Sequence, residues 1–351
     1  MEGETLPQRG LTPLRSVFRI VYHEVRLLWL GGKMDKNYKQ LKLWQGLVVL
    51  AFAALIIFVV SPKMLAPFGL YGTLLAEWLM LAGALLLVLV FRGDPKQLFP
   101  VKRPSAGGIF GTVLMWVGAL LIEMTLVLLL SIFFPERILN VNIGLSTQMI
   151  NVPFIAAFLI VAVTPAICEE AIFRGVFLRS MNPEKHRWAA IVVCAAVFGI
   201  FHGDPVRFVP TAIGGAVMAY ILLESENMVY NSIFHFINNL LPIILLFGMS
   251  GVYEKLGVWD SQGSLNMAAV QGSYTFMLSA GLYMMMCAAA PSCLYIGNYL
   301  LHSGRPGYRD KLFPGGKPGI VIFLVAASGM LFIGGLVLFL FGMMHMPVTL
   351  I

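Results

Sequence analysis

The chain has 351 residues, of which 59% are hydrophobic and only 12% are charged, and its formal net charge is +7. Soluble globular proteins are about 45–50% apolar and about 25% charged, so this composition excludes an ordinary soluble fold. It predicts an all-α, polytopic integral membrane bundle. In such a protein the positive charge indicates basic loops beside anionic lipid, and we expect membrane lipid as a partner and no nucleic acid.

Residues 1–40 form a basic segment that lacks a long apolar core. This pattern is not that of a cleaved signal peptide. The stretch 14–30 mixes large apolar residues with Arg, which is compatible with an amphipathic helix on the membrane surface. We expect this segment to be cytoplasmic, where it would dock a partner or anchor to lipid.

Apolar runs that could cross a bilayer follow one another along the rest of the chain. A spanning helix needs about 20 mostly apolar residues, and about nine segments approach that length, although the fifth and sixth are short enough that eight spans also fit. Only helices and closed barrels satisfy the backbone in lipid, and the alternating strands of a barrel are absent. The predicted spans are 41–60, 70–91, 107–134, 152–174, 188–202, 208–223, 228–249, 274–297 and 319–343.

The spans divide the chain into three N-terminal helices in 41–150, a core of four helices in 151–245 and two C-terminal helices in 246–351. Connecting segments rich in Lys and Arg alternate with poor ones, and the acidic turn at 224–227 is the exception. Because basic loops stay on the cytoplasmic side, we predict a cytoplasmic N-terminus and an external C-terminus. We expect the plasma membrane of a prokaryote.

Several ionisable residues lie inside the predicted spans, where a charged side chain costs about 2.5–3.5 kcal/mol on insertion scales. Glu77 and Glu123 are single acids with no evident partner nearby in the sequence. We interpret each as a structural hydrogen-bonding residue or as part of the lining of a wet cavity. The other ionisable residues are concentrated in 169–239 and form three groups.

The first group is Glu169, Glu170 and Arg174 in the fourth span. Residues four apart share a helix face, and an acid N-terminal to a base is the favoured order, so Glu170 and Arg174 can neutralise each other. Adjacent residues point in different directions, which leaves Glu169 without that partner. A carboxylate in a desolvated cavity can act as a base or an acid, so Glu169 is the reactive candidate and Glu170 its positioning neighbour.

The second group, at the end of the fifth span, is Phe198 and His202. The third group is a polar stripe on the seventh span: Asn231, His235, Asn238 and Asn239. Each group alone also fits a structural role, as an ion-pair cluster at a helix end, a hydrogen-bonded core histidine, or amides that hold helices together. Their joint occurrence within 169–239 favours one functional site.

At these residues the sequence resembles the CPBP (ABI) family of intramembrane peptidases, which includes type II CAAX prenyl endopeptidases and bacteriocin-processing enzymes. The family has a Glu-Glu-x-x-x-Arg motif, a Phe-x-x-x-His motif and a His-x-x-x-Asn motif on successive helices. The matching residues are Glu169, Glu170 and Arg174, then Phe198 and His202, then His235 and Asn239, with Gly175 after the arginine. Each motif alone is weak, and the ordered set is specific. The resemblance covers about 150–245.

The resemblance implies that Glu169 and His202 activate the attacking water, and that His235 and Asn239 stabilise the oxyanion. Glu170, Arg174 and Phe198 would support them. Peptide hydrolysis does need a base for water and preorganised donors for the developing negative charge.

Two views of cofactors stay open. Two histidines and a glutamate could hold a catalytic zinc ion, in which case the ligands would be His202, His235 and Glu169. The same groups also suffice without a metal, and the sequence has no His-Glu-x-x-His motif. We favour the metal-free mechanism slightly.

The leading hypothesis is therefore an intramembrane endopeptidase, a hydrolase that cuts a membrane-associated peptide or a lipidated protein in CAAX-type processing. The alternative is a non-enzymatic membrane immunity or transport factor that keeps the polar residues for structure or ion passage. Transport predicts inverted repeats, and none is evident.

One difficulty concerns depth in the membrane. At about 1.5 Å per residue, Glu169 lies about 25 Å from the outer end of its span, whereas His202 lies about 21 Å from the cytoplasmic start of its own. The two meet if the fourth helix continues past Arg174 to about Arg179, before the helix-breaking Asn182-Pro183.

Overall fold

The computed structural model describes residues 39–255, 273–303, 312–313 and 318–345, and in these ranges the chain is helical with no strand beyond one isolated bridge. The first half contains α2 (Leu43–Leu55), η1 (Ile56–Leu65), η2 (Ala66–Phe68), α3 (Leu70–Val90), α4 (Pro95–Leu98), α5 (Ala106–Phe133), α6 (Pro135–Ile150), α7 (Phe154–Ala157), η3 (Phe158–Val163), α8 (Thr164–Glu169) and η4 (Glu170–Leu178). The second half contains α9 (Arg187–Phe201), α10 (Pro205–Ser225), α11 (Met228–Lys255), α12 (Ser273–Cys287), α13 (Ala290–Leu301) and α14 (Pro318–Met344).

The polytopic helical fold predicted from composition is confirmed. The described ranges contain eight helical segments that are long and apolar enough to cross a bilayer. The predicted fifth span is the shorter apolar helix Arg187–Phe201, whereas the predicted sixth span is a full-length helix, Pro205–Ser225. The fourth runs from Phe154 to Leu178 with Arg179 as its C-cap, so it does continue past Arg174.

The interval between the third and fourth predicted spans is also helical, a difference from the predicted connecting segment. Helix α6 begins at Pro135, and a proline suits this first position because its missing N–H would have no partner there. Only Ile138 and Met149 of this helix are buried. Its mixed polar and apolar composition gave no spanning signal.

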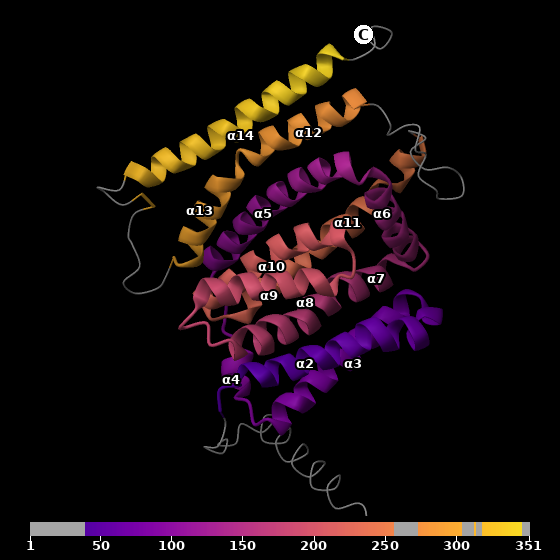
Figure 1. The fold of residues 1–351 in the computed structure, drawn as a ribbon, viewed down its shortest axis with the longest axis vertical. Helices are drawn as coiled ribbons and strands as arrows, with labels where there is room; N and C mark the ends of the chain where they lie inside the picture. The colour runs from indigo at the N-terminus through magenta and orange to yellow at the C-terminus, as the bar shows by residue number, and fades with distance from the viewer. Residues whose placement is uncertain (1–38, 256–272, 304–311, 314–317, 346–351) are drawn as a thin grey trace, which may run out of the picture.

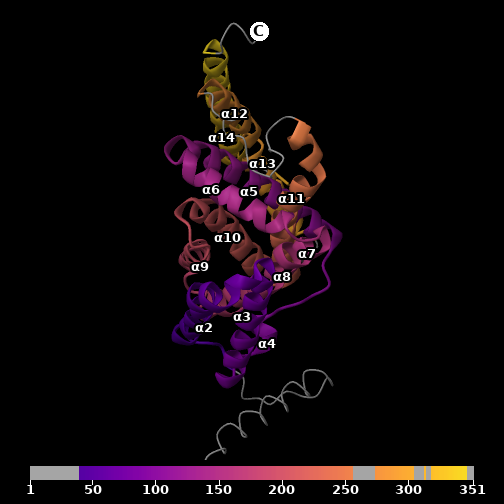
Figure 2. The same cartoon turned by 90° about the vertical axis from the view of Figure 1, so that its right-hand side faces the viewer.

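The helices are stacked along the long axis of the molecule (Figure 1). The pair α2 and α3 lies at one end, α8 to α11 and α5 form the centre, and α12 to α14 lie at the other end, an order that the rotated view repeats (Figure 2). The C-terminal helices pack closely because glycines face each other. A Cβ atom on Gly281 of α12 would lie only 2.5 Å from the Phe339 nitrogen of α14.

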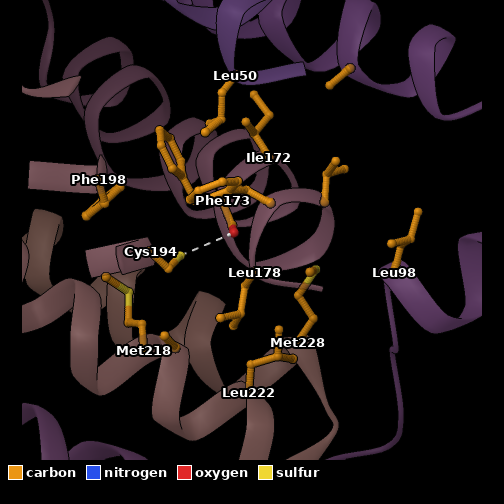
Figure 3. Close-up of a cluster of buried hydrophobic side chains, with 14 of the residues drawn as sticks. Leu50, Leu98, Ile172, Phe173, Leu178, Cys194, Phe198, Met218, Leu222 and Met228 are labelled. Atoms are coloured by element: carbon orange, nitrogen blue, oxygen red, sulfur yellow. Dashed lines mark hydrogen bonds between the residues drawn. The ribbon is translucent and has the colours of Figure 1, made fainter. Parts of the chain in front are cut away.

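The fourth span is the core of the bundle. In an apolar 18-residue stretch of this span 56% of the residues are buried, against 6% in the corresponding stretch of α14, so α14 leaves the most apolar surface for lipid among the described spans. Every residue of η4 is buried. Apolar side chains from α2, α9, α10 and α11 surround it, including Leu50, Cys194, Phe198, Met218, Leu222 and Met228 (Figure 3).

Candidate active site

The fourth span has an irregular backbone where it carries its polar residues. The segments η3 and η4 are π-helical, a rare geometry that is frequent at functional sites, although η1 shares it. Between them, Pro165 lies in the first turn of α8 and has no N–H to donate to the Val161 carbonyl four residues earlier. Asn239 of α11 supplies that donor, with its Nδ2 atom 3.0 Å from the Val161 oxygen.

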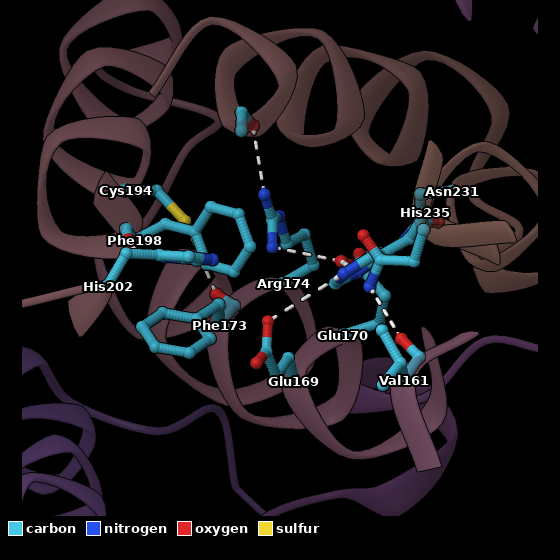
Figure 4. A network of polar contacts seen from close by, with 12 residues as sticks. Val161, Glu169, Glu170, Phe173, Arg174, Cys194, Phe198, His202, Asn231 and His235 are labelled. Carbon is cyan, nitrogen blue, oxygen red and sulfur yellow. Dashed lines mark hydrogen bonds and ion pairs between the residues drawn. The ribbon is translucent and has the colours of Figure 1, made fainter. Parts of the chain in front are cut away.

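The Glu170 carboxylate is the centre of a buried hydrogen-bond network (Figure 4). It is fully buried, and its Oε1 atom accepts from Arg174 Nη1 at 2.9 Å. Two side chains of α11 also reach it: Asn231 Nδ2 lies 2.5 Å from Oε2, and His235 Nδ1 lies 2.8 Å from Oε1. The predicted pairing of Glu170 with Arg174 is therefore present, and α11 adds two further donors.

Arg174 extends this network to two more helices. Its Nη2 atom donates to the Gly215 carbonyl of α10 at 3.3 Å, and its guanidinium carbon lies 4.0 Å from the centroid of the Phe198 ring of α9. A cation over an aromatic face is attracted by the ring electrons, more strongly where water is excluded. Phe198 therefore packs over the ion pair, and it lies one helical turn before His202.

Glu169 points away from this ion pair and toward histidines. Its Oε2 atom lies 3.7 Å from Nε2 of His235, whose other nitrogen contacts Glu170. The Glu169 side chain keeps 18% of its surface exposed, whereas His235 keeps 5%. Glu169 is thus the one carboxylate of the pair that is accessible from outside the protein interior.

His202 completes this side of the site. It is the C-cap of α9, and its Nδ1 atom lies 2.9 Å from the Phe198 carbonyl oxygen. A carbonyl can only accept, so Nδ1 carries the hydrogen, and in the neutral ring Nε2 holds the lone pair. His202 lies within electrostatic reach of both Glu169 and His235. The Phe198 ring touches both imidazoles edge-on, with centroids 4.9 Å from His202 and 5.8 Å from His235.

The remaining amides of the α11 stripe serve separate contacts. Asn239 lies one turn beyond His235 and bonds to Val161, so in the described part of the chain it is outside the Glu170 network. Because its amino group has two hydrogens, that bond leaves one for another acceptor. Asn238 accepts from the indole of Trp116 on α5 at 3.2 Å, and this contact is a helix-packing bond.

Sequence reasoning missed two residues that reach the site. Glu77 of α3 is buried, and its carboxyl group is within hydrogen-bonding and electrostatic reach of Glu169. Arg207, counted as a loop residue, lies in the first turn of α10 and interacts electrostatically with Glu169 and His202. The only signal for Glu77 was a lone acid inside an apolar span. Arg207 gave none, because α10 begins earlier than predicted.

The arrangement does not match a metal site. In the described ranges no group of three or more His, Cys, Asp or Glu side chains is disposed to hold a metal ion. The Nδ1 atoms of His202 and His235 are already committed to Phe198 and Glu170. These bonds leave the Nε2 atoms of both histidines for other partners, but in the described ranges His202, His235 and Glu169 are not disposed as a metal site, and the mechanism below has no metal step.

Comparison with known protein families agrees with this geometry. Residues 151–241 match the family model described as type II CAAX prenyl endopeptidase Rce1-like. The chain therefore carries an Rce1-like domain. This domain includes every residue of the three motifs, from Glu169 to Asn239, and the family implies a peptidase, hence a hydrolase that acts on a peptide or protein at the membrane. Neither curated proteins nor solved structures gave a match.

Together with the eight apolar helices, the Rce1-like domain indicates an integral membrane protein. Its boundaries include α7 to α10 and the first half of α11. Glu77 lies outside them, on α3.

We expect Arg174→Met to destabilise the protein by about 3–5 kcal/mol, because it leaves the Glu170 carboxylate buried without its main counter-charge. The matched control is Arg137→Met. Arg137 pairs with Asp204 at 3.1 Å but keeps 53% of its side chain exposed, so its loss should cost less than about 1 kcal/mol. Unfolding in detergent micelles measures both. Equal losses of stability in the two variants would contradict the proposed importance of the buried pair.

Proposed function

We propose that the protein is an intramembrane endopeptidase in which Glu169 and His202 activate water, and His235 and Asn239 stabilise the oxyanion. The observation that carries this proposal is the position of Glu169, which is partly exposed, 3.7 Å from His235 and within electrostatic reach of His202. Glu170 beside it is fully buried and neutralised. Two adjacent carboxylates in such different surroundings suit different tasks, one as a base and one as a support.

The first step needs a base. A water between Glu169 and His202 gives a proton to this pair, while its oxygen bonds to the carbonyl carbon of the scissile peptide and the C=O π electrons move to oxygen. The Nε2 atom of His202 is available because Nδ1 donates to the Phe198 carbonyl. The tetrahedral intermediate then expels the amine, which takes the proton from the pair. The new carboxylic acid gives its own proton to the amine, so a carboxylate and an ammonium group leave.

The second need is a set of donors for the oxyanion. The Nδ1 atom of His235 is held 2.8 Å from the Glu170 carboxylate, so its Nε2 atom faces the Glu169 side of the site and can donate to an oxyanion when it carries a hydrogen. Asn239 has a second amide hydrogen beyond the one that it gives to Val161. Because their partners fix both side chains before substrate binds, these donors require little reorganisation as charge develops.

The substrate that fits this setting is a membrane-associated peptide or a lipidated C-terminus, in CAAX-type processing by analogy with the family. An apolar groove of about 490 Å³ flanks the site between α8 and α11, lined by residues that include Val163, Ala166, Ala171, Val229 and Ile233. The groove includes Ala171, the residue that follows Glu170 in the chain. We further propose residence in a prokaryotic plasma membrane with a cytoplasmic N-terminus.

Glu169→Gln and His202→Ala should each lower kcat at least about a hundredfold, because each removes part of the base. The assay uses protein in liposomes with two quenched fluorogenic probes: a farnesylated CAAX peptide and an apolar membrane peptide without the lipid. The matched controls are Glu184→Gln and His186→Ala, which are exposed and should retain full activity. If cleavage persists in both test variants, the catalytic assignment fails and the immunity or transport alternative is favoured.

Asn239→Ala should lower kcat by about tenfold to a thousandfold with little change in KM, because an oxyanion donor acts mainly in the transition state. The neighbouring Asn238→Ala is the control. It removes a bond to Trp116 and should affect stability rather than kcat. Steady-state kinetics and thermal unfolding of both variants separate the two effects. An unchanged kcat in Asn239→Ala would remove this residue from the oxyanion site.

We expect ortho-phenanthroline to leave the rate of cleavage unchanged, because the proposed steps use only protein groups and water. The non-chelating meta isomer controls for effects of the aromatic compound on the membrane. Loss of activity with the chelator alone, reversed by added zinc, would contradict the metal-free mechanism and point to a ligand set that forms on metal binding.

A further inference from the structure

Glu77 lies far from the Rce1-like domain in sequence but next to its reactive carboxylate in space. It sits on the buried stripe of α3, with Met80, Leu81, Ala84 and Val88, while the other faces of this helix carry exposed apolar residues. Its side chain is only 3% exposed. A carboxyl group so placed needs a polar partner, because water cannot solvate it.

The packing of α3 against α8 brings this partner close. Leu81, one turn after Glu77, forms a small buried cluster with Cys168 and Ala171, the residues that flank the Glu169-Glu170 pair. Glu77 also lies near Cys168. The buried face of α3 that carries Glu77 thus packs against the helical turn that carries Glu169.

The Glu77 and Glu169 carboxyl groups lie within hydrogen-bonding reach of each other. One oxygen of each, Oε2, is buried and has no hydrogen-bond partner elsewhere in the described part of the chain. Two carboxyl groups can bond only if one of them carries the hydrogen, because ionised carboxylates are acceptors alone. Glu77 is the more deeply buried of the two, so it suits the role of donor.

We propose that Glu77 is a positioning residue that holds the Glu169 carboxyl group in its catalytic orientation through this carboxyl–carboxyl hydrogen bond. The proposal rests on the proposed function of Glu169 as the base. A carboxylate has two oxygens, so a bond from Glu77 to one of them leaves the other for water. The active site would then extend to a helix that the Rce1-like domain does not include.

The kinetic test compares Glu77→Met with Glu77→Gln. Methionine keeps the length of the side chain but removes the hydrogen bond. We therefore expect kcat to fall by about tenfold to a hundredfold, because a slightly misplaced reacting group lowers the rate by this order. KM should stay constant. Glutamine donates N–H in place of O–H and should restore kcat. Glu77→Ala replaces Glu77→Met if that variant does not fold. An unchanged kcat in the apolar variant, or an equal loss in Glu77→Gln, would overturn the positioning role.

A second test needs no substrate. The shift in unfolding temperature caused by Glu77→Met is measured in the native protein and in the Glu169→Gln background, because contacting residues give non-additive effects. Glu123→Met is the matched control. Glu123 is also a buried acid in a span, but it lies against Gly214 of α10, so its effect should be additive with Glu169→Gln. Additive shifts for Glu77 would overturn the contact.

The two tests separate failure of this inference from failure of the proposed function. If the native protein cleaves neither probe, the peptidase proposal fails and the positioning role of Glu77 fails with it. The unfolding temperatures of the single and double variants still decide whether the two carboxyl groups are in contact. If the native protein is active but the shifts in unfolding temperature of Glu77→Met and Glu169→Gln are additive, only the proposed role of Glu77 is wrong.

Discussion

The buried charge of Glu170 is the constraint on which the rest of the site depends. An unpaired carboxylate with no exposed surface would cost several kcal/mol, so each of its donors must stay in place. Arg174 comes from the same helix turn, whereas Asn231 and His235 come from α11. Through Arg174 the same charge also fixes Gly215 of α10 and the Phe198 ring of α9. Four helices are thereby held in the mutual positions that the catalytic geometry needs.

Much of this could be predicted from the sequence, because it depends on local spacing. Span length predicted the helical bundle, and the i,i+4 relation predicted the Glu170–Arg174 pair. The turn-by-turn stripe Asn231, His235 and Asn239 likewise lies on one face of α11. Such relations need only the geometry of one helix.

What could not be predicted depends on how helices pack. Nothing in the sequence relates Glu77 to Glu169, because the register of α3 against α8 is decided by side-chain fit around Leu81 and Cys168. Arg207 was missed because the helix was predicted to begin at residue 208, whereas α10 begins at Pro205. The bond from Asn239 to Val161 arises from a donor lost at Pro165, a backbone effect that periodicity does not reveal.

The shortness of α9 has a consequence for the solvent. Its 15 residues span about 22 Å, whereas the hydrocarbon layer is about 30 Å thick. Arg187, in the first turn, pairs with Glu224, and His202 caps the other end. With Arg187 at one boundary of the bilayer, a helix of this length would leave His202 about 8 Å short of the other boundary. Lipid cannot solvate the polar backbone there. Local thinning of the bilayer, or a column of water, would satisfy that backbone and would also bring the one water that each hydrolysis consumes to the depth of His202.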